Sequence, residues 1–228
     1  MADTTLQRGA RTPEYQSRRT TGIVLHSPVL YDLTVWFAFL GKERAFRDRV
    51  LELARVKSTE SVLDVGCGTG TLAIAAKLRL GPDSTVYVVD ASPEMLLRAE
   101  QKARKAGSDV HFRNGLAEAL PFSDGQFDVV LSTVMLHHLP GKARLQCANE
   151  MRRVLKPTGR VLAVDFEGFS DQKRTLISHF HRPHGHVRVE DIVALLTQAG
   201  LSAVESGPVG IRDLQFVLAQ PAARADLY

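Results

Sequence analysis

Apolar and polar residues alternate along the middle of the chain in blocks that predict strands and helices in turn. Short apolar runs of strand length lie near residues 61–65, 85–90, 109–113, 127–132 and 160–165. The stretches between them predict helices near residues 71–80, 93–106 and 142–155. Because strands that alternate with helices form a parallel sheet covered on both faces, this order predicts a doubly wound α/β fold.

Further elements flank this core. The stretches at residues 29–40, which is aromatic and apolar, and 43–54 predict two helices before the first strand. A helix near 189–199 and strands near 202–206 and 213–219 follow the core.

The composition of these flanks suggests a division of the chain. It gives a flexible polar arm (1–28), an N-terminal helical lid (29–57), the cofactor-binding sheet domain (58–220) and a short C-terminal tail (221–228). The aromatic residues between Tyr31 and Phe39 either pack on the sheet, form a contact between two copies of the chain, or close over a hydrophobic substrate.

The first predicted strand leads into a glycine-rich turn, Val-Leu-Asp-Val-Gly-Cys-Gly-Thr-Gly, at residues 62–70. Since glycine has no Cβ, such a turn is expected to let a ligand approach bare peptide N–H groups. The next strand ends at Asp90, where nucleotide-binding folds use a carboxylate to bind ribose hydroxyls. Together the turn and the acid predict an adenosine-containing cofactor.

The spacing of the glycines separates two kinds of cofactor. Dinucleotide-binding loops have the pattern Gly-x-Gly-x-x-Gly, but here Gly66, Gly68 and Gly70 are evenly spaced and Thr71 takes the place of the last glycine. Asp64, just before the turn, would repel a pyrophosphate and attract an ammonium group. These residues favour a cofactor with a ribose at one end and a cation at the other over NAD.

These motifs resemble those of the class I S-adenosylmethionine-dependent methyltransferases. Residues 120–132, 136–139 (Leu-His-His-Leu) and 153–162 are similar to the branch that contains ubiquinone and menaquinone biosynthesis methyltransferases. The resemblance covers about residues 43–167. It implies S-adenosyl-L-methionine as the cofactor and a seven-stranded, mostly parallel, Rossmann-like sheet whose last strand is reversed.

The resemblance carries cofactor-binding roles to the turn and to the ends of the neighbouring strands. The residues are Asp64, Gly66, Cys67, Gly68, Gly70, Asp90, Ala91, Leu116, Ala117 and Ser132. Asp64 would either hold the glycine turn or meet the ammonium group of the cofactor, and Asp90 would bind the ribose or cap the next helix. Related enzymes often carry an acid where this chain has Leu116, so the Leu116 backbone and Ala117 are the expected contacts to adenine.

Candidate catalytic residues follow the fourth and fifth predicted strands. His137 and His138 come shortly after the fourth strand, and imidazole is a suitable general base near neutral pH. Alternatively, one of them packs or caps the loop before Pro140. Asp165 ends the fifth strand and is either a base, a substrate ligand or a hydrogen-bond anchor for the following loop.

Half of the histidines stand close together, since four of the eight lie between His179 and His186. Such a cluster is typical of a metal site or of a loop on the substrate side. Because no cysteine or acid is spaced among these histidines, the sequence favours the loop and we predict no metal site.

Composition narrows the class and location of the protein. The chain of 228 residues is 44% hydrophobic, which is enough for one substantial core. Its 29 basic and 25 acidic residues are interspersed, so nucleic-acid binding is not supported. The two cysteines are too few for a disulfide framework, which predicts a cytoplasmic protein, and no apolar run has the length of a transmembrane segment.

The sequence therefore predicts a methyltransferase that acts on a small-molecule acceptor, and the aromatic lid favours a hydrophobic, lipid-like or quinone-like one. A homodimer is compatible with the same aromatic residues. The stretch from Ser132 to His138 lacks the Asn/Asp-Pro-Pro-aromatic motif of enzymes that methylate nucleic-acid amino groups. Two alternatives stay open: a regulatory protein that binds S-adenosylmethionine or S-adenosylhomocysteine without turnover, and an oxidoreductase that uses NAD.

Overall fold

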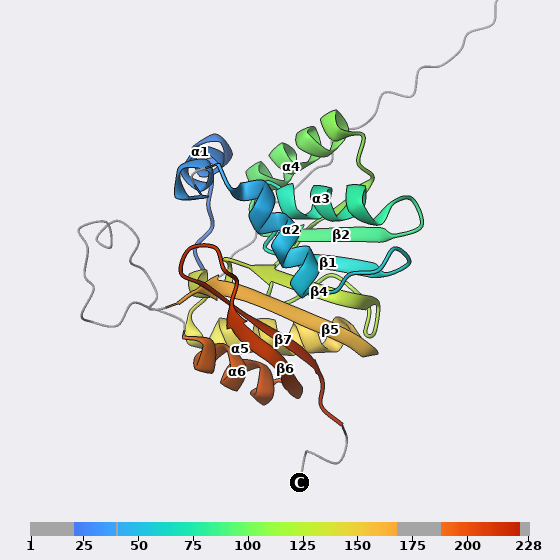
Figure 1. The fold of residues 1–228 in the computed structure, drawn as a ribbon, viewed down its shortest axis with the longest axis vertical. Helices are drawn as coiled ribbons and strands as arrows, with labels where there is room; N and C mark the ends of the chain where they lie inside the picture. The colour runs from blue at the N-terminus through green and yellow to red at the C-terminus, as the bar shows by residue number, and fades with distance from the viewer. Residues whose placement is uncertain (1–20, 40, 168–187, 224–228) are drawn as a thin grey trace, which may run out of the picture.

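The computed structural model describes residues 21–39, 41–167 and 188–223. These residues form a seven-stranded sheet in the order β3-β2-β1-β4-β5-β7-β6 (Figure 1). The strands are β1 (Ser61–Val65), β2 (Thr85–Asp90), β3 (Val110–Asn114), β4 (Phe127–Thr133), β5 (Leu155–Phe166), β6 (Leu201–Pro208) and β7 (Leu214–Pro221). β1 to β5 pair in parallel, and β7 is antiparallel to both β5 and β6. The predicted mostly parallel sheet with a reversed last strand is confirmed.

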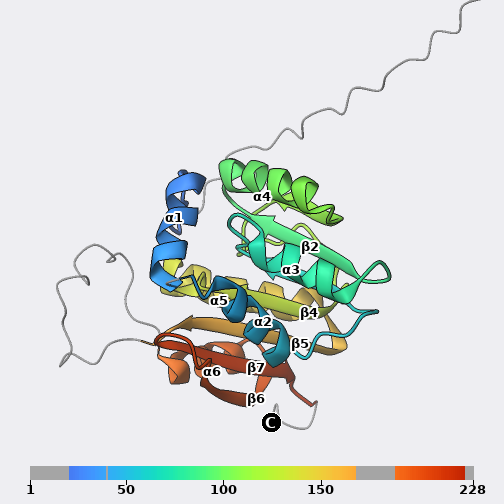
Figure 2. The ribbon, with the colours of Figure 1, turned by 45° about the horizontal axis from the view of Figure 1, so that its top comes forward.

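Helices cover both faces of this sheet (Figure 2). They are α1 (Pro28–Phe39), α2 (Glu43–Leu53), α3 (Thr71–Leu80), α4 (Pro93–Ala106), α5 (Gly141–Val154) and α6 (Val189–Gln198), with one turn of 3-10 helix, η1, at Leu136–His138. One apolar cluster joins the first face to α2, α3 and α4, through residues such as Val50, Ile74 and Leu96. A second cluster joins the other face to α5 and α6, through residues such as Met151 and Leu196. The predicted doubly wound architecture is confirmed.

Local sequence accounts for the start of α4, which holds part of the candidate site. Ser92 is the N-cap, and its Oγ accepts a hydrogen bond of 3.3 Å from the backbone N–H of Met95. Pro93 occupies the first turn, where its missing N–H costs nothing. Gly107 ends the helix in the left-handed conformation.

Strand β5 is longer than the sequence pattern predicts. It begins at Leu155, which pairs with Phe127 of β4 before a register shift between Phe127 and Val129. The sequence between Leu155 and Arg160 contains a proline and a glycine, so it has the composition of a turn. The pairing with β4 holds this segment in the sheet.

The strand order reverses at β1, which lies between β2 and β4. In doubly wound sheets the carboxyl ends of the strands around such a switch point form the ligand-binding crevice. Figure 2 shows α1 at this edge of the sheet, whereas α2 lies against the first face. The topology therefore directs attention to the loops that follow β1, β2 and β4.

Candidate functional site

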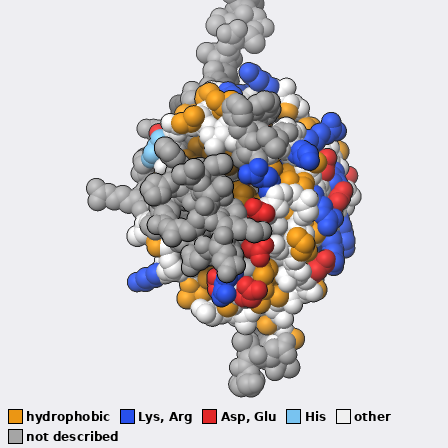
Figure 3. All heavy atoms as spheres, turned by 60° about the vertical axis from the view of Figure 1, so that its left-hand side comes forward, with side chains coloured by type: hydrophobic (Ala, Val, Ile, Leu, Met, Phe, Trp, Pro, Cys, Tyr) orange, Lys and Arg blue, Asp and Glu red, His pale blue; other side chains and the backbone are white. Residues whose placement is uncertain are grey.

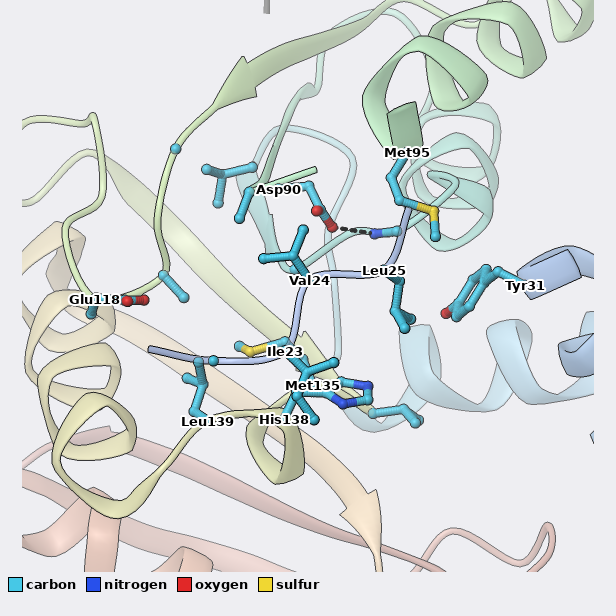
Figure 4. Close-up of a pocket in the computed structure, with 18 residues that line it drawn as sticks. Ile23, Val24, Leu25, Tyr31, Asp90, Met95, Glu118, Met135, His138 and Leu139 are labelled. Carbon is cyan, nitrogen blue, oxygen red and sulfur yellow. Dashed lines mark hydrogen bonds between the residues drawn. The ribbon is translucent and has the colours of Figure 1, made fainter. Parts of the chain in front are cut away.

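A cavity of about 90 Å³ lies at this switch point (Figure 4). Its walls come from the glycine turn after β1, from the end of β2 and from the loops after β3 and β4. The residues are Gly66, Gly68, Val89, Asp90, Ala91, Met95, Gly115, Ala117, Glu118, Val134, Met135, His138 and Leu139, joined from the N-terminal side by Gly22, Ile23, Val24, Leu25 and Tyr31.

Two glycines of the turn are required by their surroundings. Gly66 has φ +72°, and a Cβ built on it would lie 2.3 Å from Cγ of Met135. Gly68 has φ +53°, and its Cβ would lie 3.3 Å from the ring of Tyr31. At both positions the positive φ and the close neighbour disfavour any residue with a Cβ, so glycine is required. The turn therefore borders the cavity at Gly66 and Gly68 without a side chain at either position.

The N–H groups of the turn are not bare, and this part of the sequence-based expectation is wrong. The N–H groups of Gly66 and Cys67 donate to the carbonyl oxygen of Val89, at 2.9 and 3.2 Å. The N–H of Gly68 donates to Oδ2 of Asp90 at 2.8 Å. These donors hold the turn against β2, so charged ligand groups must be bound mainly by side chains.

Gly70 has a packing role. Its φ is +73°, and a Cβ there would lie 2.8 Å from the Cβ of Ala99 on α4. Gly70 also caps the start of α3. This glycine lets α3 and α4 approach each other, and it does not line the cavity.

The carboxylate of Asp90 connects the turn to the start of α4. Its second oxygen, Oδ1, accepts a hydrogen bond of 2.9 Å from the N–H of Ser92. Burial raises the pKa of Asp90 to about 6, although the N–H groups of Ser92 and Gly68 act in the opposite direction. Each carboxylate oxygen has a lone pair beyond the one used here, so Asp90 can still accept hydrogen bonds from ribose hydroxyls.

Asp64 is buried at the end of β1, with 1% of its surface exposed. Its Oδ1 has no hydrogen-bond partner within the described part of the chain. Burial, followed by the charge of Asp90, raises the pKa of Asp64 to about 7. A buried carboxylate oxygen without a partner is costly, and a cationic ligand group would relieve that cost. The residues present therefore fit the ammonium end of S-adenosylmethionine.

The predicted cofactor residues fall into two groups. Gly66, Gly68, Asp90, Ala91 and Ala117 line the cavity. The others lie around it: Asp64 and Ser132 are buried at neighbouring strand ends, Cys67 packs against the first apolar cluster, Gly70 packs on α4, and Leu116 forms an isolated bridge with Ala119. Ser132 is fully buried, and its Oγ, like Oδ1 of Asp64, has no partner among the residues described.

An N-terminal strap, residues 22–26, crosses the crevice. The N–H of Ile23 donates to the carbonyl oxygen of His138 at 3.1 Å, and Nδ1 of His26 lies 3.2 Å from Oε2 of Glu94 on α4. Figure 4 shows Val24 and Leu25 of this strap below the Asp90 carboxylate. Sequence reasoning assigned this segment to the polar arm, and the only signal against that assignment was the apolar run that follows Gly22.

The strap explains why the cavity is small. Pockets that bind cofactors have volumes of roughly 300–1,000 Å³, which is well above the volume left beside the strap. S-adenosylmethionine therefore fits the chemistry of this crevice on the condition that residues 22–25 are displaced.

His137 and Asp165 come together beside this cavity. Nδ1 of His137 lies 2.7 Å from Oδ1 of Asp165, and the backbone N–H of His137 donates to Oδ2 at 3.1 Å. Asp165 is fully buried, while the His137 side chain is 22% exposed. The ring of Phe166 meets the His137 ring edge-on, with centroids 6.0 Å apart. His138 instead lines the cavity, with its ring 4.0 Å from that of His137.

A strained residue precedes the histidines. Val134 has φ +52°, which is rare for a β-branched side chain and costs on the order of 1–3 kcal/mol. Its N–H donates to the carbonyl oxygen of Val164 at 2.8 Å. The sharp turn at Val134 brings Met135 beneath Gly66 and starts η1. The histidine cluster between residues 179 and 186 lies outside the described residues.

Comparisons with known proteins agree with this fold. A family model described as a methyltransferase domain matches residues 62–159. The demethylmenaquinone methyltransferase of Thermus thermophilus is 35% identical over 136 residues, which are 60% of this chain and 60% of that protein. The arsenite methyltransferase of Halobacterium salinarum is 35% identical over 154 residues, which are 65% of this chain and 39% of that protein. The chain thus spans less than two thirds of the length of these curated relatives.

A solved structure shares the fold over most of the chain. The S-adenosylmethionine-dependent methyltransferase from Aquifex aeolicus superposes with a TM-score of 0.70 at 22% identity, covering 86% of this chain and 98% of that one. The domain match and the relatives confirm the resemblance to methyltransferases, and the residues of the crevice fit S-adenosyl-L-methionine better than NAD. The chain is therefore similar to methyltransferases over residues 62–159 and shares the fold of a solved S-adenosylmethionine-dependent methyltransferase.

Proposed function

We propose that this chain transfers a methyl group from S-adenosyl-L-methionine to a small hydrophobic acceptor, of the quinol type, that has an ionisable hydroxyl group. The observation that carries the proposal is the pair formed by His137 and Asp165, at the carboxyl ends of the strands that also border the cofactor crevice. A base at this position suits an acceptor that must lose a proton.

The cofactor end of the proposed site is inferred from the two buried carboxyl groups of Asp64 and Asp90. In this proposal Asp64 meets the ammonium group of the cofactor and Asp90 its ribose hydroxyls, while Gly66 and Gly68 give it room. The bound cofactor supplies an electrophilic methyl group. The main contribution of the protein is to hold the acceptor in line with that methyl group, which can lower the barrier by roughly 7–11 kcal/mol.

The acceptor end follows from the orientation of His137. A carboxylate at Nδ1 favours the tautomer whose proton is on Nδ1, and this leaves Nε2 as a proton acceptor. Nε2 would remove the hydroxyl proton of the acceptor, with an expected contribution of about 10² to 10⁴ in rate. Phe166, whose surface is 37% exposed, offers an apolar wall beside the His137 ring.

The two relatives are named for different methyl acceptors, demethylmenaquinone and arsenite. The cysteines of this chain bear on which of the two is the better guide. A soft arsenic(III) acceptor calls for thiolate ligands. The two cysteines of this chain, Cys67 and Cys147, pack in the clusters on opposite faces of the sheet. Burial raises the pKa of both thiols, so neither is a ready thiolate. The demethylmenaquinone relative is therefore the better guide to the acceptor.

Other partners and the location stay at the level of proposal. On the face shown in Figure 3, basic side chains at the right-hand edge alternate with acidic ones, and this arrangement favours a small molecule over nucleic acid. Of the helices in the described ranges, none has both the length and the apolar character to cross a bilayer. A cytoplasmic location and a homodimer remain predictions from the sequence.

Labelled methyl transfer tests the proposal. The full chain is incubated with S-adenosyl-L-methionine carrying an isotopic methyl group and with a quinol that has a free ring position beside a hydroxyl group. We expect a product in which one labelled methyl group has replaced one hydrogen of the quinol, and a much slower reaction with His137→Gln. If the wild-type chain binds S-adenosylhomocysteine but labels neither the quinol nor any compound of a metabolite extract, transfer is refuted and the regulatory alternative gains support.

A further inference from the structure

Asp32 of α1 joins three parts of the cofactor site. Its Oδ1 accepts hydrogen bonds from Oγ1 of Thr69 at 2.7 Å and from Nζ of Lys102 at 2.6 Å. Its Oδ2 accepts from Nε of Arg98 at 3.3 Å. Thr69 belongs to the glycine turn, and Arg98 and Lys102 belong to α4. We call these four residues the Asp32 clasp.

The clasp is internally complete and partly shielded from water. Lys102 also donates to Oγ1 of Thr69 at 2.8 Å, which closes a triangle with Asp32. The side chains of Asp32 and Lys102 are 25% and 22% exposed. Burial alone would raise the pKa of Asp32, but the hydrogen bonds from Lys102 and Thr69 outweigh it and hold that pKa below its ordinary value. The carboxylate is therefore ionised at neutral pH.

The N-terminal half of α1 has little apolar packing of its own. Val29, Leu30 and Leu33 are 68%, 63% and 50% exposed. The other half is held by Val35 and Phe39, which pack on the first apolar cluster. Since burial of apolar surface is the main force that fixes a helix, the position of the N-terminal half depends on the clasp and on the contact of Tyr31 with Gly68.

Tyr31 is the neighbour of Asp32 and faces the cavity. Successive residues of a helix point about 100° apart, so Tyr31 lies over Gly68 while Asp32 reaches Thr69 and α4. Figure 4 shows the Tyr31 hydroxyl directed toward the cavity. Asp32 itself does not line the cavity.

We propose that Asp32 is a positioning residue for cofactor binding, which acts by holding Tyr31 against Gly68 at the cofactor crevice. The inference rests on the proposed function, because it assigns Tyr31 to the wall that a bound cofactor contacts. It predicts that a change at Asp32 affects cofactor affinity only while the Tyr31 side chain is present.

A double-mutant cycle tests this coupling, with S-adenosylhomocysteine as the probe and calorimetry as the measurement. We expect Asp32→Asn to raise Kd about tenfold, because coupled neighbours typically interact with an energy of that order. Tyr31→Ala should raise Kd at least as much. In the double variant, Asp32→Asn should add nothing to the loss caused by Tyr31→Ala. At saturating cofactor, kcat of Asp32→Asn should equal that of the wild type.

A matched control is Asp48→Asn, which removes the same charge from an exposed pair with Arg44 on α2. Its Kd should equal that of the wild type. If Asp32→Asn does not fold, Lys102→Gln takes its place in the cycle, because it weakens the clasp from α4 with Asp32 intact. Circular dichroism and a thermal transition establish folding for each variant.

The outcomes distinguish this inference from the proposed function. If the wild-type chain does not bind S-adenosylhomocysteine, the proposed function fails. If it binds but the losses at positions 31 and 32 add, or Tyr31→Ala binds like the wild type, the positioning role of Asp32 is overturned and the proposed function stands.

Discussion

Nδ1 of His137 lies 2.7 Å from Oδ1 of Asp165, although His137 follows β4 and Asp165 lies at the end of β5. The Asp165 carboxylate also accepts the backbone N–H groups of His137 and Phe166, at 3.1 and 2.8 Å. With three donors and no solvent exposure, this carboxylate is fixed in place. Because Asp165 bonds both the ring and the backbone N–H of His137, it fixes the orientation of the imidazole. We therefore expect the two residues to act together.

Substitution of either partner should slow methyl transfer without weakening cofactor binding. We expect His137→Gln to lower kcat by about 10² to 10⁴, the usual contribution of a general base. Asp165→Asn should also lower kcat, because an amide donor at Nδ1 favours the tautomer that protonates Nε2. Steady-state kinetics give kcat, and calorimetry with S-adenosylhomocysteine gives Kd. A parallel loss of binding in both variants would mean that the pair supports the fold of the crevice instead of the reaction.

Cofactor affinity should rise with pH between about 5 and 7. Burial raises the pKa of Asp64 to about 7 and that of Asp90 to about 6, so the cofactor-free protein holds protons that the unfolded chain has released. These raised values favour the folded state below the ordinary carboxyl pKa of 3.8, and that stabilisation is lost as the pH rises from there to about 6 to 7. A bound ammonium group favours ionised Asp64, so binding must expel the proton below pH 7.

The expected size of this effect is a fall in Kd of up to about tenfold per pH unit below the pKa of Asp64. Calorimetry with S-adenosylhomocysteine in buffers of different ionisation enthalpy measures both the affinity and the protons released. Asp64→Asn removes one titrating group, so its affinity should be lower and its pH dependence flatter. The same pH dependence in Asp64→Asn would exclude Asp64 as the source.

Gly70 and Gly107 offer a matched pair of substitutions. Both have left-handed backbones, with φ of +73° and +61°, but a Cβ on Gly70 meets Ala99 whereas one on Gly107 meets nothing within 4 Å. Gly107→Ala should cost only the left-handed strain, about 1 kcal/mol. Gly70→Ala should cost about 1–3 kcal/mol more, because α3 and α4 must separate. Denaturant unfolding measures both.

A second substitution isolates the contact. Ala99→Gly removes the Cβ that Gly70→Ala would meet, so the double variant should recover part of the loss and leave the strain. If Gly70→Ala and Gly107→Ala cost the same, the close approach of α3 and α4 does not explain Gly70.

The sequence predicted those features that depend on the order of strands and on their ends. Asp64, Asp90 and Asp165 each end a strand, and a parallel sheet brings such ends to one edge. The contact between His137 and Asp165 could not be predicted, because it depends on the register of β4 against β5 and on the turn at Val134. Sequence reasoning therefore treated the two residues as separate candidates.

Two other features depend on contacts between distant parts of the chain. The N–H groups of Gly66 and Cys67 reach the carbonyl oxygen of Val89 only because β1 and β2 pair in this register. The residues of the strap have no periodicity, and their attachments to His138 and Glu94 leave no trace in the local sequence. Local patterns predicted the crevice, whereas they did not predict what lies across it.

Removal of the strap should speed cofactor entry. Residues 22–25 occupy space that a cofactor needs, so binding requires the bonds of Ile23 to His138 and of His26 to Glu94 to open. When only a fraction of the molecules is open, apparent affinity falls by that fraction. A variant that lacks residues 1–26 keeps α1 and the Asp32 clasp, and it should bind S-adenosylhomocysteine with a higher association rate constant. Stopped-flow measurements give this constant, and a variant that lacks only residues 1–20 is the control. Equal association rates in the two variants would show that the strap does not limit entry, whereas a faster rate already in the control would assign the barrier to the residues before it.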